Sequence, residues 1–174
     1  GESGRVVEAV VAVGLGVPVL AKLTPSATGL ARVAAATASA GANAVTVGNT
    51  VRALLVDAEA RRPVLGSSGG GLSGPAIKPI ALRAVHDVHQ ELPELPILGT
   101  GGIGNGRDAV EMLLAGASAV GVGTATFAEP RATLRILTEL IAWCAAHGVR
   151  SVRELTGAMR AHDLELVTDE ERNR

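Results

Sequence analysis

Two segments of the chain, Ala40–Thr50 and Ala115–Ala125, follow one pattern: glycine at the end of a helical stretch, an apolar strand, and a polar loop that opens on glycine. The segments before them match as well, because Pro18–Lys22 aligns with Pro96–Thr100. The repeating unit is therefore strand–helix–strand–helix. Tandem copies of this unit build a (β/α)8 barrel, whose active site lies where the strands end. The repeat predicts an α/β fold with parallel strands.

Apolar patterning and the positions of Gly and Pro locate the individual elements. The predicted strands are Pro18–Leu23, Ala44–Gly48, Ile97–Gly99 and Ala119–Val122. The predicted helices are Ser3–Val13, Thr28–Ser39, Ile77–Gln90, Gly106–Leu114, Glu129–Ala146 and an amphipathic C-terminal helix over Arg150–Ala161. Val51–Gly74 is predicted as an irregular insertion, and such long loops are commonly functional.

The length of the chain limits how much of a barrel it can form. It has 174 residues, whereas a (β/α)8 barrel takes at least about 200. Half a barrel leaves two sheet edges and an apolar face uncovered. We therefore expect a fragment, or a half-barrel that another copy or another chain completes. Residues 1–163 are assigned to this half-barrel, and the charged segment 164–174 is expected to be a disordered tail.

Composition excludes several classes of protein. Hydrophobic residues make up 47% and aromatic residues 1% of the chain, which indicates a core of Val, Ile, Leu and Ala, typical of buried parallel strands. A net charge of -1 predicts no nucleic-acid partner. The single Cys excludes an intrachain disulfide and favours a cytoplasmic location. No apolar run reaches the roughly 20 residues of a membrane span and no signal peptide is visible, so no membrane partner is expected.

Glycines follow two neighbouring predicted strands. Gly101 and Gly102 come after one strand, and Gly123 and Thr124 after the next. Glycine lets backbone N–H groups approach anionic oxygens closely, and a short helix that begins near Thr124 would add its positive end. These glycines could also merely turn the chain. Two such sites on adjacent strands favour a phosphate site, because barrels commonly bind phosphate after their last two strands.

Polar side chains end the first two predicted strands. Lys22 is expected to be buried, and buried lysines are rare unless they are paired. Because the predicted strands carry no carboxylate, Lys22 is predicted to face an anionic ligand or a developing negative charge rather than a structural ion pair. Asn49 and Thr50 could bind an amide or imide edge, or could equally be turn residues.

Other reactive residue types are interpreted as structural. His86 and His89 have a spacing that could share a metal ion, but no third ligand is near in the sequence, so no metal site is predicted. Cys144 is predicted to pack on the barrel from the last helix, and Arg61 and Arg62 to be solvated.

An ordered set of motifs resembles the dihydroorotate dehydrogenase family. The matching runs, in order and spacing from Val17 to about Met159, are Lys22–Pro25, Asn49–Thr50, Arg61–Gly66, Gly70–Pro79, Gly101–Ile103 and Val122–Ala125. Gly70–Pro79 is the most specific run. The resemblance is greatest to the C-terminal half of the NAD-linked, class 1B catalytic subunit.

The resemblance implies an FMN-binding (β/α)8 barrel that oxidises (S)-dihydroorotate to orotate in UMP biosynthesis. By matching position, Lys22 would contact the flavin and stabilise negative charge on reduced FMN. Gly48 would lie against the flavin and Gly74 would line its site. Asn49 and Thr50 would bind the orotate ring. The FMN phosphate would be held by Gly101, Gly102, Gly123 and Thr124.

The resemblance also implies partners. Class 1B relatives work with an iron–sulfur, FAD-containing electron-transfer subunit, and a homodimer or heterotetramer is expected. The family's catalytic base, a Cys or Ser in an Asn-x-Ser-Cys-Pro-Asn-like loop, has no counterpart here, and Ser26 stands where relatives often have Asn. We therefore expect the isolated chain to be inactive.

Two alternatives stay open. One is another FMN barrel, such as a dihydropyrimidine dehydrogenase or a tRNA-dihydrouridine synthase, although a net charge of -1 argues against the RNA-binding enzyme. The other is an inactive half-barrel, either a truncated product or a phosphate-binding scaffold.

Overall fold

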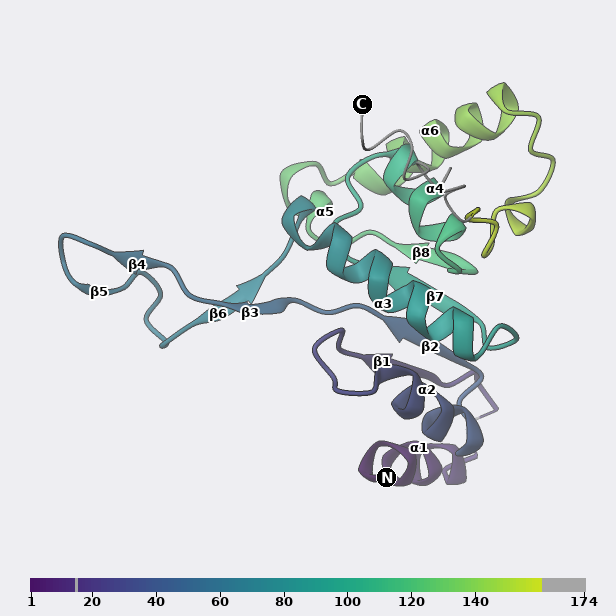
Figure 1. Ribbon diagram of the computed structural model, residues 1–174, viewed down its shortest axis with the longest axis horizontal. Coiled ribbons are helices and arrows are strands. Elements are labelled where there is room, and N and C mark those ends of the chain that lie inside the picture. The colour runs from purple at the N-terminus through teal and green to yellow at the C-terminus, as the bar shows by residue number, and fades with distance from the viewer. Residues whose placement is uncertain (15, 161–174) are drawn as a thin grey trace, which may run out of the picture.

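A computed structural model describes residues 1–14 and 16–160. Within these ranges, four parallel strands form one sheet in the order β1-β2-β7-β8. The strands are β1 (Leu20–Leu23), β2 (Ala44–Val47), β7 (Ile97–Thr100) and β8 (Ala119–Gly121). The helices are α1 (Glu2–Ala12), α2 (Leu30–Ser39), α3 (Lys78–Glu91), α4 (Gly106–Leu114), α5 (Ala125–Ala128) and α6 (Ala132–Ala146). Figure 1 shows the helices following one another along the sheet, from α1 at one end to α6 at the other.

The sheet matches the half-barrel prediction, because β1 and β8 each pair on one side only. One face of the sheet is covered by the helices. Val45, Val47 and Ile97 on this face are buried in a single core with residues of the helices. The other face is only partly buried at Thr46, Leu98 and Thr100, and the edge residue Leu20 is exposed. The core therefore sits between the sheet and its helices.

The sequence repeat is also a repeat of hydrogen bonds. At the end of α2, Gly41 has a φ of +99° and donates its N–H to the Ala38 carbonyl oxygen at 3.0 Å, while the Ala42 N–H reaches Thr37 at 3.0 Å. The same two bonds, at 2.9 and 3.1 Å, follow α4 around Gly116. This Schellman ending requires a left-handed residue, which explains the glycine in both copies.

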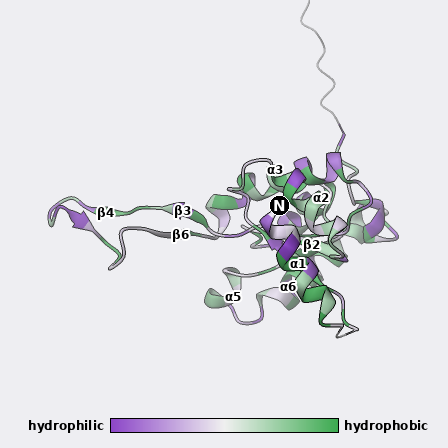
Figure 2. Cartoon of the chain, turned by 90° about the horizontal axis from the view of Figure 1, so that it is seen from below, coloured by the Kyte–Doolittle hydropathy of each residue, from purple (hydrophilic) through white to green (hydrophobic). Residues whose placement is uncertain are grey.

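The insertion after β2 is a β-arm, so the prediction of an irregular loop was wrong. Strand β3 (Val51–Ala53) pairs antiparallel with β6 (Gly70–Leu72), and β4 (Val56–Asp57) pairs with β5 (Arg62–Pro63). The arm projects away from the helices and the sheet (Figures 1 and 2). These strands are too short to show an alternating pattern of apolar and polar residues, and the glycines of β6 have no side chain that could contribute to one.

The tip of the arm is organised locally. The Asp57 carboxylate accepts hydrogen bonds from the N–H groups of Glu59 and Ala60 at 3.1 and 2.9 Å. Arg61 then turns the chain with a φ of +51°. Arg61 and Arg62 are both exposed, as predicted.

The predicted C-terminal helix over Arg150–Ala161 was also wrong. The chain forms only a 3-10 turn, η2 (Val152–Glu154), capped by the Ser151 side chain. Gly157 then takes a φ of +70° and donates its N–H to the Leu113 carbonyl oxygen at 3.0 Å, so the backbone pairs with the end of α4 instead of continuing a helix. Ala161, the boundary at residue 163 and the segment 164–174 lie outside the described residues.

The remaining predicted helices occur with shifted ends. α6 begins at Ala132 rather than Glu129, because the short α5 precedes it. Cys144 packs against the core from α6, as predicted. Among the described residues, no helix has both the length and the apolarity needed to cross a bilayer.

Candidate functional site

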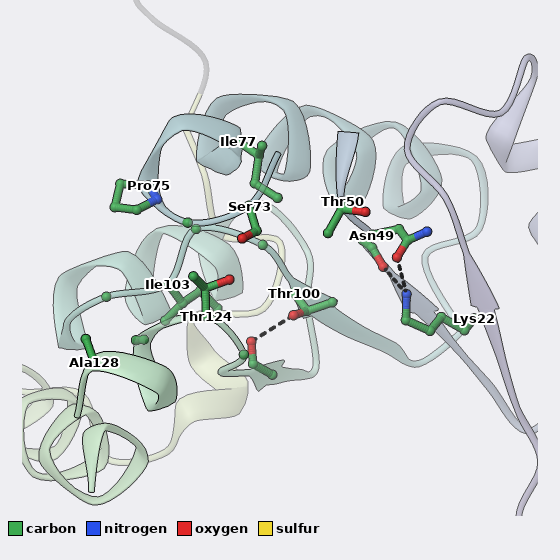
Figure 3. Close-up of a pocket in the computed structure, with 18 residues that line it drawn as sticks. Lys22, Asn49, Thr50, Ser73, Pro75, Ile77, Thr100, Ile103, Thr124 and Ala128 are labelled. Carbon is green, nitrogen blue, oxygen red and sulfur yellow. Dashed lines mark hydrogen bonds between the residues drawn. The ribbon is translucent and has the colours of Figure 1, made fainter. Parts of the chain in front are cut away.

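A cavity of about 390 Å³ lies at the carboxyl ends of the parallel strands. Figure 3 shows its lining. Every residue predicted to bind the cofactor or the substrate lines this cavity: Lys22, Gly48, Asn49, Thr50, Gly74, Gly101, Gly102, Gly123 and Thr124. Residues more than 100 positions apart in the sequence are thus brought together because parallel strands end at one edge of the sheet.

The lining also contains residues that the sequence argument did not single out. These are Ser73, Pro75, Ile77, Thr100, Ile103, Gly104, Gly121, Ala125 and Ala128. Thr100 ends β7 and aligns with Lys22 in the sequence repeat, so the same strand-end rule could have found it. Its hydroxyl donates to the Gly121 carbonyl oxygen at 2.9 Å, which makes it a link between β7 and β8.

Lys22 and Asn49 form the polar end of the cavity. The Lys22 ammonium donates to the Gly48 carbonyl oxygen at 2.9 Å and to Asn49 Oδ1 at 3.0 Å (Figure 3). No carboxylate pairs with Lys22 in residues 1–14 and 16–160, so its positive charge is not compensated there by an ion pair. This arrangement favours the anionic-ligand interpretation of Lys22.

Lys22 is exposed, whereas it was predicted from the sequence to be buried. The reason is that β1 lies at the edge of the sheet, with a neighbouring strand on one side only. Asn49 uses its oxygen on Lys22, and its amide nitrogen points away from the ammonium (Figure 3). Asn49 therefore keeps a hydrogen-bond donor for a ligand.

Two of the glycines are required by the fold itself. Gly48 has a φ of +133°, and a side chain there would overlap the Thr100 carbonyl oxygen. Gly102 has a φ of +78°, and an added Cβ would stand 2.7 Å from the Cα of Lys78. Close packing of the loop onto α3 thus explains Gly102 without any ligand.

Gly123 is different. Its φ is not in the left-handed region, and an added Cβ would meet no atom within 4 Å. The described protein therefore leaves open space at this point of the cavity. The backbone N–H groups of Gly102, Gly123 and Thr124 have no acceptor in the part of the chain that the structure describes. Unpartnered N–H groups around open space suit a phosphate.

The short helix predicted near Thr124 is present, since α5 starts at Ala125 with Thr124 as its N-cap. Together, these observations give the cavity two chemically different ends. One end carries an ammonium and an amide, and the other carries backbone N–H donors without a cationic side chain in the lining. A ligand with a polar ring system and a phosphate group fits such a cavity.

A network of charged side chains lies behind the glycine loop. The Lys78 ammonium contacts Asp108 Oδ1 and Glu111 Oε2, each at 2.7 Å. Asp108 Oδ2 accepts the N–H groups of Gly104 at 2.8 Å and Asn105 at 3.1 Å. The Asn105 and Asp108 spacing is a capping-box pattern, which is the one sequence signal that could have revealed this network.

The network holds its groups ionised. Burial raises the pKa of the Asp108 carboxyl, but hydrogen bonds from Lys78 and the Gly104 N–H outweigh it, so the pKa lies below its ordinary value of 3.8. The hydrogen bond to Asp108 is the main cause that raises the pKa of Lys78. Both groups are charged at neutral pH, and Lys78 is therefore committed to this network.

A second cluster surrounds Arg135 on α6. Its guanidinium donates to Glu129 at 2.9 Å, to Glu139 at 2.8 Å and to the Gly104 carbonyl oxygen at 3.2 Å. The hydrogen bond to Glu129 is the main cause that raises the pKa of Arg135. The hydrogen bond from Arg135 lowers the pKa of Glu139, whose other oxygen accepts the Gly106 N–H at 2.6 Å. Nothing in the sequence pointed to Arg135.

The described residues contain no cluster of three or more His, Cys, Asp or Glu side chains that could hold a metal ion. The cavity lining likewise contributes no such side chain.

The family model for dihydroorotate dehydrogenase matches residues 3–143. The catalytic subunit of dihydroorotate dehydrogenase B (NAD(+)) from Geobacter sp. (strain M21) is 50% identical over 142 residues, covering 82% of this chain and 46% of that protein. The same subunit from Desulforudis audaxviator (strain MP104C) is 48% identical, covering 81% and 46%. The chain thus spans about half the length of the curated relatives it matches.

Solved structures agree with these matches. The crystal structure of dihydroorotate dehydrogenase from Eimeria tenella in complex with ferulenol has a TM-score of 0.67 and 28% identity, covering 81% of this chain and 38% of that one. The ligand-free enzyme has a TM-score of 0.68 and 28% identity, covering 82% and 40%. The parallel sheet with its helices and the family match over residues 3–143 lead to one conclusion: the chain belongs to the dihydroorotate dehydrogenase family.

Proposed function

We propose that this chain supplies the FMN phosphate site and one wall of the orotate pocket of an enzyme that oxidises (S)-dihydroorotate to orotate in UMP biosynthesis. The observation that carries the proposal is the two-ended cavity. Lys22 and Asn49 lie at one end, and the free N–H groups of Gly102, Gly123 and Thr124 lie at the other. The dehydrogenase names of the relatives support the reaction.

FMN, when bound, supplies the hydride acceptor. The backbone donors of Gly101, Gly102, Gly123 and Thr124 would hold its phosphate. Gly48 would lie against the ring system, and Gly74 would line its site through the backbone. Lys22 stabilises negative charge that develops beside its ammonium during the reaction, because its charge is not already neutralised by a carboxylate.

Asn49 and Thr50 would orient the orotate ring. The Lys22 ammonium fixes the Asn49 amide, so the amide nitrogen is presented as a donor to a ring carbonyl oxygen. The base that removes the second proton has no motif in this chain. We propose that it comes from residues outside these 174 positions, and that the chain alone does not turn over.

We further propose an electron-transfer partner that carries an iron–sulfur centre and FAD. The names of the relatives support a separate partner subunit, since they describe the catalytic subunit of an NAD(+)-linked enzyme. The iron–sulfur centre and FAD follow from the family resemblance. The assembly would be a homodimer of catalytic subunits or a heterotetramer with the partner.

A chimeric enzyme tests the proposed function. This chain replaces the matching segment of the Geobacter sp. (strain M21) relative, and flavin content and anaerobic flavin bleaching by dihydroorotate are measured. We expect FMN to bind and to be reduced by dihydroorotate but not by dihydrouracil. The isolated chain serves as the inactive comparison, and NAD reduction is expected only after the relative's electron-transfer subunit is added.

A folded chimera that binds no FMN, or that prefers dihydrouracil, would contradict the proposal. Turnover of dihydroorotate by the isolated chain would show that the base lies within these 174 residues.

A further inference from the structure

We propose that Arg135 is a positioning residue that ties together the two loops of the phosphate site and so sets the affinity for the phosphate end of the cofactor. The two loops are the first loop, Gly101–Gly104, and the second loop, Gly123–Thr124 with the helix α5 that follows it. This inference rests on the proposed function, because it assigns a role in binding the FMN phosphate. It concerns a residue that does not line the cavity.

The first half of the tie is the contact with the first loop. The Arg135 guanidinium donates to the Gly104 carbonyl oxygen at 3.2 Å. Glu139, held by Arg135 at 2.8 Å, accepts the Gly106 N–H at 2.6 Å. The guanidinium thus binds the first loop directly, and it also holds the Glu139 carboxylate that attaches the start of α4 to α6.

The second half of the tie runs to the second loop. Glu129, which accepts from Arg135 at 2.9 Å, follows directly after α5. Its own N–H donates to the Ala125 carbonyl oxygen at 3.0 Å, in the first turn after Thr124. The planar Arg135 guanidinium thus spans the two loops. Its hydrogen bonds to Gly104 and Glu129 hold the loops in a single relative position.

The spacing of the two loops matters for phosphate binding because the described lining has no cationic side chain at this end of the cavity. Lys22 is the one cationic side chain among the lining residues that the structure describes, and it contacts Gly48 and Asn49 at the other end of the cavity. Phosphate binding would then depend on backbone N–H groups, whose hydrogen bonds are sensitive to position. Arg135 cannot replace them, since Glu129 and Glu139 already occupy its donors.

A comparison of FMN with riboflavin tests this role, because riboflavin lacks the phosphate. Flavin fluorescence titrations on the full chain give both affinities for the wild type, Arg135→Gln, Arg135→Lys and Glu129→Gln. Arg83→Gln is the matched control, since Arg83 also forms an ion pair four residues apart, with Asp87 at 2.7 Å, on α3 outside this cavity.

We expect Arg135→Gln to weaken FMN binding about tenfold, the scale of one lost charged hydrogen bond, and to change riboflavin binding by less than about twofold. Arg135→Lys should lose nearly as much, because an ammonium keeps the charge but cannot span both loops. Glu129→Gln should lower the ratio of FMN affinity to riboflavin affinity by a smaller factor, and Arg83→Gln should leave this ratio unchanged.

Equal losses for FMN and riboflavin would overturn the proposal, because they would indicate a merely structural role. A full FMN preference in Arg135→Lys would also overturn it, because charge alone would then be sufficient. If Arg135→Gln fails to fold, the FMN and riboflavin affinities of Glu129→Gln test the proposal instead, since the Glu129 side chain is 44% exposed. A wild type that does not prefer FMN over riboflavin would instead contradict the proposed function itself.

Discussion

The two copies of the repeat share a frame but differ in what they place at its end. In both, a glycine closes the helix with the same pair of hydrogen bonds. In both, a side chain just before the second strand accepts from the backbone at the start of the first: Asn43 from Val19 at 2.8 Å, and Ser118 from Ile97 at 3.4 Å. The first copy then presents side chains to the cavity, and the second copy presents backbone.

The support behind each copy differs accordingly. Helix α2 of the first copy has a glycine N-cap without a side-chain hydrogen bond, whereas α4 of the second copy has a full capping box. The charged clusters of Lys78 and Arg135 both attach to the second copy. A flexible lysine can adjust to its ligand, but a backbone donor must be held in place. The comparison indicates that backbone-mediated binding is the part of the site that needs rigid support.

Matched glycine substitutions in the two copies should give the largest difference in stability. Gly48→Ala should cost more than about 3 kcal/mol in the free energy of unfolding, because the new methyl group overlaps the Thr100 carbonyl oxygen at a positive φ. Gly123→Ala should cost less than about 0.5 kcal/mol, since it enters open space. Urea denaturation measures both. Similar losses in the two variants would contradict this assignment.

Lys22→Ala tests the side-chain end of the site. In the chimeric enzyme we expect flavin reduction by dihydroorotate to slow about 100-fold, the scale of losing one preorganised electrostatic contact. FMN affinity should change little, because Lys22 lies at the end opposite the phosphate donors. Stopped-flow reduction and a flavin titration separate the two effects. An unchanged reduction rate would exclude the proposed role.

Asp108→Asn tests the support behind the second copy. At neutral pH we expect a loss of about 1–2 kcal/mol in the free energy of unfolding, from the lost charge on the Gly104 and Lys78 hydrogen bonds. Because the pKa of Asp108 is lowered in the folded protein, its contribution is present above its ordinary value of 3.8 and is lost as the pH falls through the lowered pKa.

The difference between wild type and Asp108→Asn should therefore shrink below about pH 3.8, and denaturation curves across that range measure it. A difference that stayed constant with pH would mean that the carboxylate charge is not what stabilises the loop.

The smallest expected difference lies in the shared frame. Asn43→Ala should cost about 1 kcal/mol, because it removes a hydrogen bond of 2.8 Å. Ser118→Ala should cost about 0.5 kcal/mol or less, because its bond is 3.4 Å long. Thermal unfolding of the two variants ranks them. The reverse order would show that the copies differ in their frame as well as in their ends.

Much of the site could be predicted because it follows from strand ends. Lys22, Asn49 and Gly123 lie far apart in the chain, yet each lies at or just after the carboxyl end of a strand in one parallel sheet, and such ends meet at one edge. The family motifs then added Gly48 and Gly74 to the same lining. Burial of Lys22 was predicted incorrectly because the pattern of one strand does not say whether that strand is at an edge.

The parallel α/β repeat and its glycine-closed helices could be predicted from local patterns, because an apolar run, a helical spacing and a left-handed residue each act within a few positions. Three features became visible only in the folded chain: the pairing of β3 with β6, the turn at Gly157 that replaces the predicted helix, and the hydrogen bond from Arg135 to Gly104. Each of these joins groups that no periodic pattern connects. Their contacts arise from packing between elements, which local sequence does not encode.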